Sequence, residues 1–324
     1  MKFFIGKLTP VFYAFCAVVA GAGLAAGGQS VPSLDDGIAL MQQNKLSDAR
    51  AVFESILQRD PQNHNAEDQE VIVIERLALD QRAGNHMVEA LQVLLDGQKV
   101  VPGSARLAYD TGILEDEMHL YSEAAKSLAT AQQLHMDDPT LLYAMARVQM
   151  DAGQLEPAEQ SMQKYLEQRP GDASAHYGLG RIYQLGMQFD KATAEFRESI
   201  RLQPVQSESW YQLGDIALKQ QQYDEALTDF SHTLERNPRH GGALAGSGEA
   251  FFREKQYNKA LDFLDRAIAA APDYQTGHYY RGLTLARLGR KEESEKELAT
   301  AAELADAENK KSATRYQLTV PGRP

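Results

Sequence analysis

Residues 207–238 read SESWYQLGDIALKQQQYDEALTDFSHTLERNP, and this stretch decides the fold. Counted from its first residue, Gly214 stands at position 8, Ala226 at position 20, Phe230 at position 24 and Pro238 at position 32. The spacing predicts two helices joined by a short turn, with the proline ending the second because it cannot continue a helix. A glycine inside a helix costs about 1 kcal/mol relative to alanine. We therefore expect Gly214 to make room for a close approach of Ala226.

The same arrangement returns every 34 residues. Seven units in phase run from residue 71 to residue 308 without insertion or deletion, and an eighth fits residues 30–63 after a shift. The seven extra residues, 64–70, are expected to form a longer loop or a helix extension. Positions 8 and 24 pair a small residue with a bulky one in the other six in-phase units: Ala78 and Leu94, Gly112 and Leu128, Ala146 and Met162, Gly180 and Phe196, Gly248 and Leu264, Gly282 and Leu298.

Short polar residues recur where the second helix of each unit is expected to begin. Their side chains could accept hydrogen bonds from the free amides of a helix start, so we expect them to act as caps. At position 18 these residues are Ser47, Ser122, Asp190, Asp224 and Asn258.

The pattern resembles the tetratricopeptide repeat (TPR), a helix pair of about 34 residues. The resemblance implies an all-α fold, a right-handed α-solenoid or superhelix of antiparallel helix pairs, whose first helices line a concave face. It covers residues 30–311 and leaves a C-terminal tail at 312–324. The units lie near 30–63, 71–104, 105–138, 139–172, 173–206, 207–240, 241–274 and 275–308.

The N-terminal segment has the three parts of a secretory signal peptide. Lys2 and Lys7 precede an uncharged stretch at residues 8–26. Small residues predominate at the end of the segment, from position 20 to position 28, and cleavage is expected after Ala22, Ala25 or Ala26. The alternative for residues 1–29 is an uncleaved membrane anchor, because residues 8–26 approach the length that spans a bilayer. Either route predicts export from the cytoplasm, to the periplasm or the medium, or to a membrane-anchored position.

Charge and cysteine content narrow the function classes. The formal charge of −12 excludes a nucleic-acid partner, because phosphate binding needs an excess of Lys and Arg, and it favours basic protein surfaces. Cys16 is the single cysteine and lies in the N-terminal apolar segment, so the rest of the chain has neither a disulfide nor a thiolate.

Motifs for catalysis, metals and cofactors are lacking. The sequence contains no H-E-x-x-H and no nucleophile elbow of the form G-x-S-x-G. Residues 21–26 fit G-x-G-x-x-A, but they form the small-residue end of the leader rather than a strand-to-helix turn. We therefore predict no enzyme activity, no cofactor and no metal site.

The family resemblance implies a groove to which positions 5 and 9 of the first helices contribute. Tyrosine is typical of binding surfaces, since it offers a large face with few torsions to fix, although tyrosine at position 5 also packs against the neighbouring unit. The candidate groove residues are Tyr109, Tyr143, Tyr177, Tyr211 and Tyr279 at position 5, and Arg147, Arg181, Asp215 and Glu249 at position 9.

The predicted function is a non-enzymatic scaffold or adaptor that holds a protein or peptide in the concave groove, outside the cytoplasm, in cell-envelope, secretion or pilus assembly. Two alternatives remain open at this point. One is a non-catalytic subunit of an envelope polysaccharide-synthesis complex, and the other is a self-associating structural protein. Contact with a membrane is expected only through residues 8–26, if they are retained.

Overall fold

The computed structural model describes residues 31–319, and within them the chain forms sixteen helices and no strand. The predicted leader or anchor at residues 1–29, with Cys16, lies outside the described residues. The helices form eight consecutive pairs: α1 (Leu34–Gln42) and α2 (Leu46–Arg59), α3 (His64–Ala83) and α4 (Met87–Val100), α5 (Ala105–Glu117) and α6 (Tyr121–Gln133), α7 (Pro139–Asp151) and α8 (Leu155–Gln168), α9 (Ala173–Leu185) and α10 (Phe189–Leu202), α11 (Ser207–Lys219) and α12 (Tyr223–Arg236), α13 (Gly241–Arg253) and α14 (Tyr257–Ala270), and α15 (Gln275–Arg287) and α16 (Lys291–Thr319). The all-α solenoid predicted from the repeat is confirmed.

The extra residues 64–70 begin a helix rather than a loop. They form the first turns of α3, which has 20 residues where most of the other first helices have 13. At the other end of the chain, α16 continues past the last expected unit to Thr319.

Short polar side chains cap the first helices, not the second. The second helices start one residue before position 18, and none of the seven from α2 to α14 has a side-chain cap. The prediction that the residues at position 18 act as caps is therefore wrong, because these residues already lie within the first turn. The amides of six first helices are instead bonded by the side chains of Ser33, Asn63, Ser104, Asp138, Asp172 and His240.

A left-handed residue closes every turn between the two helices of a pair. The next residue then donates its N–H to the carbonyl five residues back, as in the Gln188 N to Tyr183 O bond of 2.9 Å, which ends the first helix in a Schellman motif. These turn residues, all with φ between 57° and 79°, are Asn44, Asn85, His119, Gly153, Met187, Gln221, Lys255 and Gly289.

The small residue at position 8 lies against the bulky residue at position 24 of its own pair. A Cβ added to Gly214 would lie 2.6 Å from the ring of Phe230, and one added to Gly180 would lie 2.7 Å from the ring of Phe196. The ring of Phe230 is therefore the first group that a side chain at position 214 would meet. Both phenylalanines are fully buried, so these two pairs are each built around a bulky side chain that lies on a glycine backbone.

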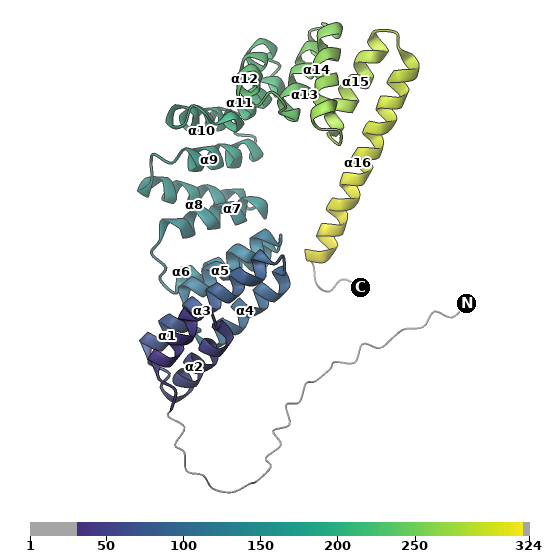
Figure 1. The fold of residues 1–324 in the computed structure, drawn as a ribbon. Helices are drawn as coiled ribbons and strands as arrows, with labels where there is room; N and C mark the ends of the chain where they lie inside the picture. The colour runs from purple at the N-terminus through teal and green to yellow at the C-terminus, as the bar shows by residue number, and fades with distance from the viewer. Residues whose placement is uncertain (1–30, 320–324) are drawn as a thin grey trace, which may run out of the picture.

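The pairs stack into an arc, which Figure 1 shows from α1 and α2 at one end to α15 at the other, with α16 running back on the open side. Most consecutive first helices contact one another, for example α3 with α5, α5 with α7 and α13 with α15. Between residues 31 and 319, consecutive second helices make no contact of that extent. The stack therefore bends toward its first helices, which form the concave side. None of the helices in this range is long and apolar enough to cross a membrane.

Candidate functional site

Three of the predicted groove tyrosines are half-buried packing residues. The ring of Tyr143 lies 5.3 Å from that of Tyr165, and the ring of Tyr177 lies 5.8 Å from that of Phe196. Tyr211 packs against His240 at 4.6 Å, and burial raises its pKa. These side chains join a first helix to its own second helix or to the next unit, so their main physical role is packing.

The other two tyrosines lie in different surroundings. Tyr279 is 41% exposed and meets the edge of Tyr280, with ring centroids 5.2 Å apart. Tyr109 lines a cavity on the concave side, between α3, α5 and α7. The five tyrosines therefore do not form one continuous exposed ladder.

Two of the charged residues at position 9 bond to position 12 of the preceding unit. Arg147 donates to the carboxylate of Asp116, which is buried. Asp215 accepts from Gln184 Nε2 at 3.0 Å and from Lys219 Nζ at 2.6 Å. Both position-9 residues thus join neighbouring units.

Glu249 has a similar joining role further along the chain. It accepts a hydrogen bond of 2.5 Å from the hydroxyl of Tyr280 in α15 and pairs with Arg253 at 3.2 Å. Burial, followed by the bond to Glu249, raises the pKa of Tyr280 to about 12. The hydroxyl therefore remains a donor, and Glu249 is held against the next unit.

Arg181 differs from Arg147 although both stand at position 9. Its only hydrogen bond among the described residues runs from Nη1 to the Tyr177 hydroxyl at 3.3 Å, and no carboxylate pairs with it, whereas Nε is buried without an acceptor in both arginines. Arg181 also lies within electrostatic range of Asp151 without bonding to it. Partial burial raises the pKa of Asp151, whereas the charges of Arg147 and Arg181 lower that pKa. Of the two groove arginines, Arg181 is the one whose guanidinium has no carboxylate partner among the described residues.

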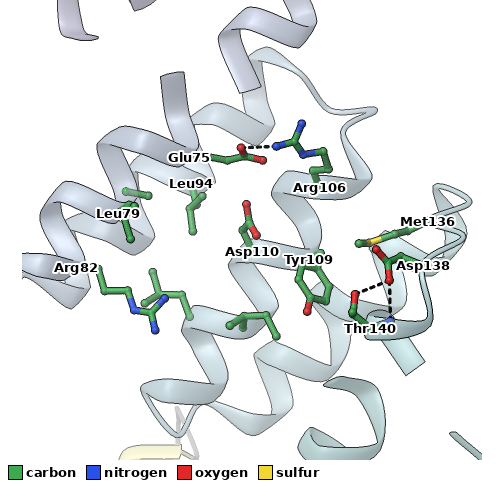
Figure 2. A pocket seen from close by; sticks show the side chains of 13 residues that line it. Glu75, Leu79, Arg82, Leu94, Arg106, Tyr109, Asp110, Met136, Asp138 and Thr140 are labelled. Carbon is green, nitrogen blue, oxygen red and sulfur yellow. Dashed lines mark hydrogen bonds and ion pairs between the residues drawn. The ribbon is translucent and has the colours of Figure 1, made fainter. Parts of the chain in front are cut away.

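The concave side also holds a cavity that the sequence reasoning missed. It has a volume of about 500 Å³ and lies between α3, α5 and the start of α7 (Figure 2). Leu79 lines it with 59% of its surface exposed, next to the more buried Leu94 and Leu114. Exposed apolar surface at a hollow with polar walls is typical of a binding site. We call this cavity the α3–α5 pocket.

Charged groups form one wall of the α3–α5 pocket. Arg106 Nη2 lies 2.5 Å from Glu75 Oε2, and Figure 2 shows the Asp110 carboxyl directed toward Glu75. Burial, and then the charge of Glu75, raise the pKa of Asp110 to about 6, while burial also raises that of Glu75. A cation bound beside these two neighbouring carboxyl groups would stabilise the ionised form of both.

The sequence does contain a signal for this pocket. In the unit that starts at residue 71, position 5 holds Glu75 instead of tyrosine and position 9 holds Leu79 instead of a charged residue. The row of tyrosines at position 5 begins one unit later, at Tyr109, so a search for those tyrosines does not find Glu75 and Leu79. The signal for the pocket was this departure from the repeat on the concave side.

The described residues include no group of three or more His, Cys, Asp or Glu side chains that could hold a metal ion. The eight histidines are too scattered to form one. Two of them hold units together: His176 lies between Glu195 at 2.6 Å and the carbonyl of Pro170 at 3.1 Å, and His278 has the same arrangement in a later unit.

Family models described as tetratricopeptide repeat match residues 188–231 and 211–275, and a second such model matches residues 117–182. A search of curated proteins finds no match.

Several solved structures are similar in fold. A tetratricopeptide repeat protein from Parabacteroides merdae is 17% identical with a TM-score of 0.61, over 71% of this chain and 91% of its own. The APC/C hetero-tetramer Cut9–Hcn1 is 15% identical with a TM-score of 0.54, over 78% of this chain and 55% of the other. YrrB, described as a TPR protein with an unusual peptide-binding site, is 21% identical with a TM-score of 0.46, over 57% of this chain and 95% of its own.

Proposed function

Since this chain belongs to the tetratricopeptide repeat family, we propose that it is a non-enzymatic scaffold that holds a segment of another protein along its concave side. The α3–α5 pocket is the main anchor for that segment. The fold supports this proposal because stacked repeats present an extended, preformed surface. A preformed surface loses little conformational freedom on binding.

The observation that carries the proposal is the exposure of Leu79 at the α3–α5 pocket. Its apolar surface lies beside the Glu75–Arg106 ion pair and the Asp110 carboxyl. A segment with one apolar side chain and a neighbouring basic group would bury the leucine and satisfy the acids together. The formal charge of −12 favours the same kind of partner.

Arg181 and Tyr279 are the further contacts along the groove. Arg181 has donors to spare, and Tyr279 has an exposed face. Arg147, Asp215 and Glu249 are engaged between units, so we assign them to holding the groove in shape. An acidic or carbonyl group of the bound segment would face Arg181.

The test is site-specific photo-crosslinking in cells, with a benzophenone amino acid at Leu79. The matched control carries it at Val88, which is apolar and 67% exposed but lies in the second helix α4. We expect a discrete crosslinked protein from position 79 and none from position 88. The protein that is captured is then purified and its dissociation constant is measured.

Leu79→Asp should weaken that complex by about tenfold or more, because burial of a leucine is worth about 1.5–3 kcal/mol. Arg181→Glu should also weaken it, whereas Val88→Asp should not. Equal affinities for wild type, Leu79→Asp and Arg181→Glu would remove the concave side as the binding surface.

We also propose that the protein acts outside the cytoplasm. Support comes from the sequence of residues 1–28 alone, with two lysines, an uncharged apolar stretch and small residues before the repeats. Mass spectrometry of the protein isolated from cell fractions measures both location and N-terminus. A cytoplasmic protein that keeps its leader would contradict this part of the proposal.

A further inference from the structure

A second cleft lies away from the concave side, between the second helices α10 and α12. Because consecutive second helices do not meet closely, they leave a gap whose floor is the first helix between them, α11. The gap has a volume of about 360 Å³. Its floor is apolar, formed by Leu213, Ile216 and Ala217, and its walls are polar. We call it the α10–α12 cleft.

Asp229 lines this cleft with a carboxyl group that has no hydrogen-bond donor among the described residues. The residue is only 8% exposed, yet its carboxylate accepts no hydrogen bond from any residue between 31 and 319. Its carboxylate oxygens keep only slight contact with solvent, and a carboxylate that loses most of its hydration without gaining a hydrogen bond is costly. Burial, and then the charge of Glu225, raise the pKa of Asp229 to about 6.

The other buried acids of the described chain all have a donor. Glu70 bonds to Arg50, Glu115 accepts from Ser127 at 2.6 Å, and Asp116 accepts from Arg147. The carboxyl of Asp229 is the exception, and it is also the one of these four that lines the α10–α12 cleft. One oxygen of Glu70 and one of Asp116 are also buried without a partner in the described chain, so Asp229 differs in that neither of its oxygens has a donor there.

The charges around the cleft favour a cation. Three carboxyl groups line it, those of Asp190, Glu225 and Asp229, against one guanidinium, that of Arg197. Arg197 pairs with Glu225 at 3.5 Å and is 65% exposed, so it acts on Asp229 through its charge without bonding to it. A cationic group entering the cleft would therefore meet a net negative wall.

The shape of the cleft selects among cations. An apolar floor with acceptors on its walls suits a guanidinium, which is planar, weakly hydrated and donates along its edge. Gln220 and Gln222 add amide oxygens to the rim. An ammonium group is more strongly hydrated and would gain less from the apolar floor.

We propose that the α10–α12 cleft receives an arginine side chain from a basic segment of a partner protein, with its guanidinium bonded to Asp229 above the floor formed by Ile216. This site is separate from the concave groove. The chain would then hold two segments at once, one on its concave side and one between its second helices.

The test uses the full chain with ¹³C-labelled isoleucine methyl groups and a small probe, N-acetyl-arginine methylamide. NMR follows the Ile216 methyl signal as the probe is added. N-acetyl-citrulline methylamide, which has the same shape without the charge, is the control probe. We expect a saturable shift of Ile216 with the arginine probe and none with the citrulline probe.

The matched variants are Asp229→Asn and Asp224→Asn. Asp224 lies on the same helix, is exposed and does not line the cleft. A hydrogen bond to a charged group is worth about 1.5–3 kcal/mol, so Asp229→Asn should weaken the probe about tenfold or more. Asp224→Asn should leave its affinity within about twofold, as expected of a solvent-screened charge. Because neither variant touches the concave side, both should leave binding at the α3–α5 pocket intact.

The affinity should also depend on pH. Protonation of Asp229 competes with the guanidinium, so the probe should bind about tenfold more weakly at pH 5 than at pH 7.5. Glu225 and His232 on the same helix, and Asp190 and Arg197 on α10, are the other charged or titratable groups at the site. Asp229→Asn should lose most of the pH dependence, which separates Asp229 from these neighbours.

Three outcomes would overturn the proposal. One is the absence of a saturable shift at Ile216, which means that the Asp229 carboxylate is only hydrated. The second is an equal response to the citrulline probe. The third is unchanged affinity in Asp229→Asn, which means that arginine collects at the acidic surface without using this cleft.

Discussion

Met187 holds a left-handed backbone conformation, with φ of 57°, in the turn between α9 and α10. A left-handed conformation costs a residue with a Cβ roughly 1–2 kcal/mol, whereas glycine adopts it freely. The side chain of Met187 is 76% exposed, so it returns little packing for this strain. The same turn position holds Gly153 and Gly289 in two other pairs.

Met187→Gly should therefore stabilise the protein. The relief of backbone strain exceeds the entropy that glycine loses on folding, and we expect a gain of about 0.5–1 kcal/mol. The measurement is chemical denaturation followed by circular dichroism. Gly153→Ala is the reverse control. A Cβ at position 153 meets nothing within 4 Å, so the expected loss of about 1 kcal/mol in the free energy of unfolding would come from backbone strain and not from a steric clash. A loss of stability in Met187→Gly would contradict the strain argument.

The roles of Arg147 and Arg181 show what a single repeat position can and cannot predict. The two residues share position 9, and within one unit they are indistinguishable. They differ because the facing residue of the preceding unit is Asp116 for the first and Met150 for the second. A comparison across 31 residues would have predicted the ion pair of Arg147. The hydrogen bond of Arg181 to Tyr177 depends on local rotamers, which the pattern does not determine.

At the scale of elements, α13 packs closely on the preceding helix pair. Its residue Gly246 faces the ring of Phe230 in α12, and a Cβ added there would lie 2.5 Å from that ring. Gly214 of α11 faces the same ring at 2.6 Å. One aromatic ring is thus held between two glycine backbones, which draws α13 onto α12.

Gly246→Ala should destabilise the protein although alanine is the better helix former. The added methyl group overpacks the Phe230 ring, and overpacking of this kind costs about 1–3 kcal/mol, more than the roughly 1 kcal/mol that helix propensity returns at most. Thermal unfolding checks this, with Gly171→Ala as the control, since a Cβ at Gly171 meets nothing within 4 Å. A higher melting temperature for Gly246→Ala would contradict the proposed contact.

The elements themselves could be predicted from the sequence better than their ends. The 34-residue recurrence of small and bulky residues predicted the helix pairs, because position 8 must lie against position 24. The caps could not be predicted in the same way. Asp190 and Asp224 resemble caps by residue type, but the Schellman turn starts each second helix early and places both residues inside it.

At the scale of the whole molecule, the core is divided among neighbouring units. Phe53 belongs to a buried cluster between residues 46 and 114, and Phe230 to another between residues 217 and 243. In such a stack each unit contacts its neighbours alone, so stability is nearly a sum of local terms. Damage at one end should therefore spread over a limited distance.

Phe230→Ala should loosen α11 to α14 while leaving α3 to α6 protected. The loss of a buried phenylalanine costs about 3–5 kcal/mol, which is enough to open the local units. Hydrogen exchange read by mass spectrometry measures this helix by helix. Phe53→Ala is the mirror control, with faster exchange expected in α1 to α4 alone. Equal loss of protection along the whole chain in either variant would show a single cooperative unit.

The two cavities are properties of the assembled stack that the repeat pattern did not predict. The α3–α5 pocket arises where one unit departs from the consensus at Glu75 and Leu79. The α10–α12 cleft arises where second helices separate along the outer side. Each cavity is formed by residues of three helices together. The repeat period describes one unit at a time, so it does not predict which residues of different helices meet.

From α5 to α15 the first helices start at steps of 34 residues. An in-frame deletion of residues 173–206 would therefore join α8 to α11 with the same phase that the chain already uses. At the new junction Met150 would face Asp215 in place of Gln184, so the hydrogen bond between Gln184 and Asp215 would be lost. Evolution can thus shorten or lengthen this molecule by whole 34-residue units, without changing the residues that lie near either end.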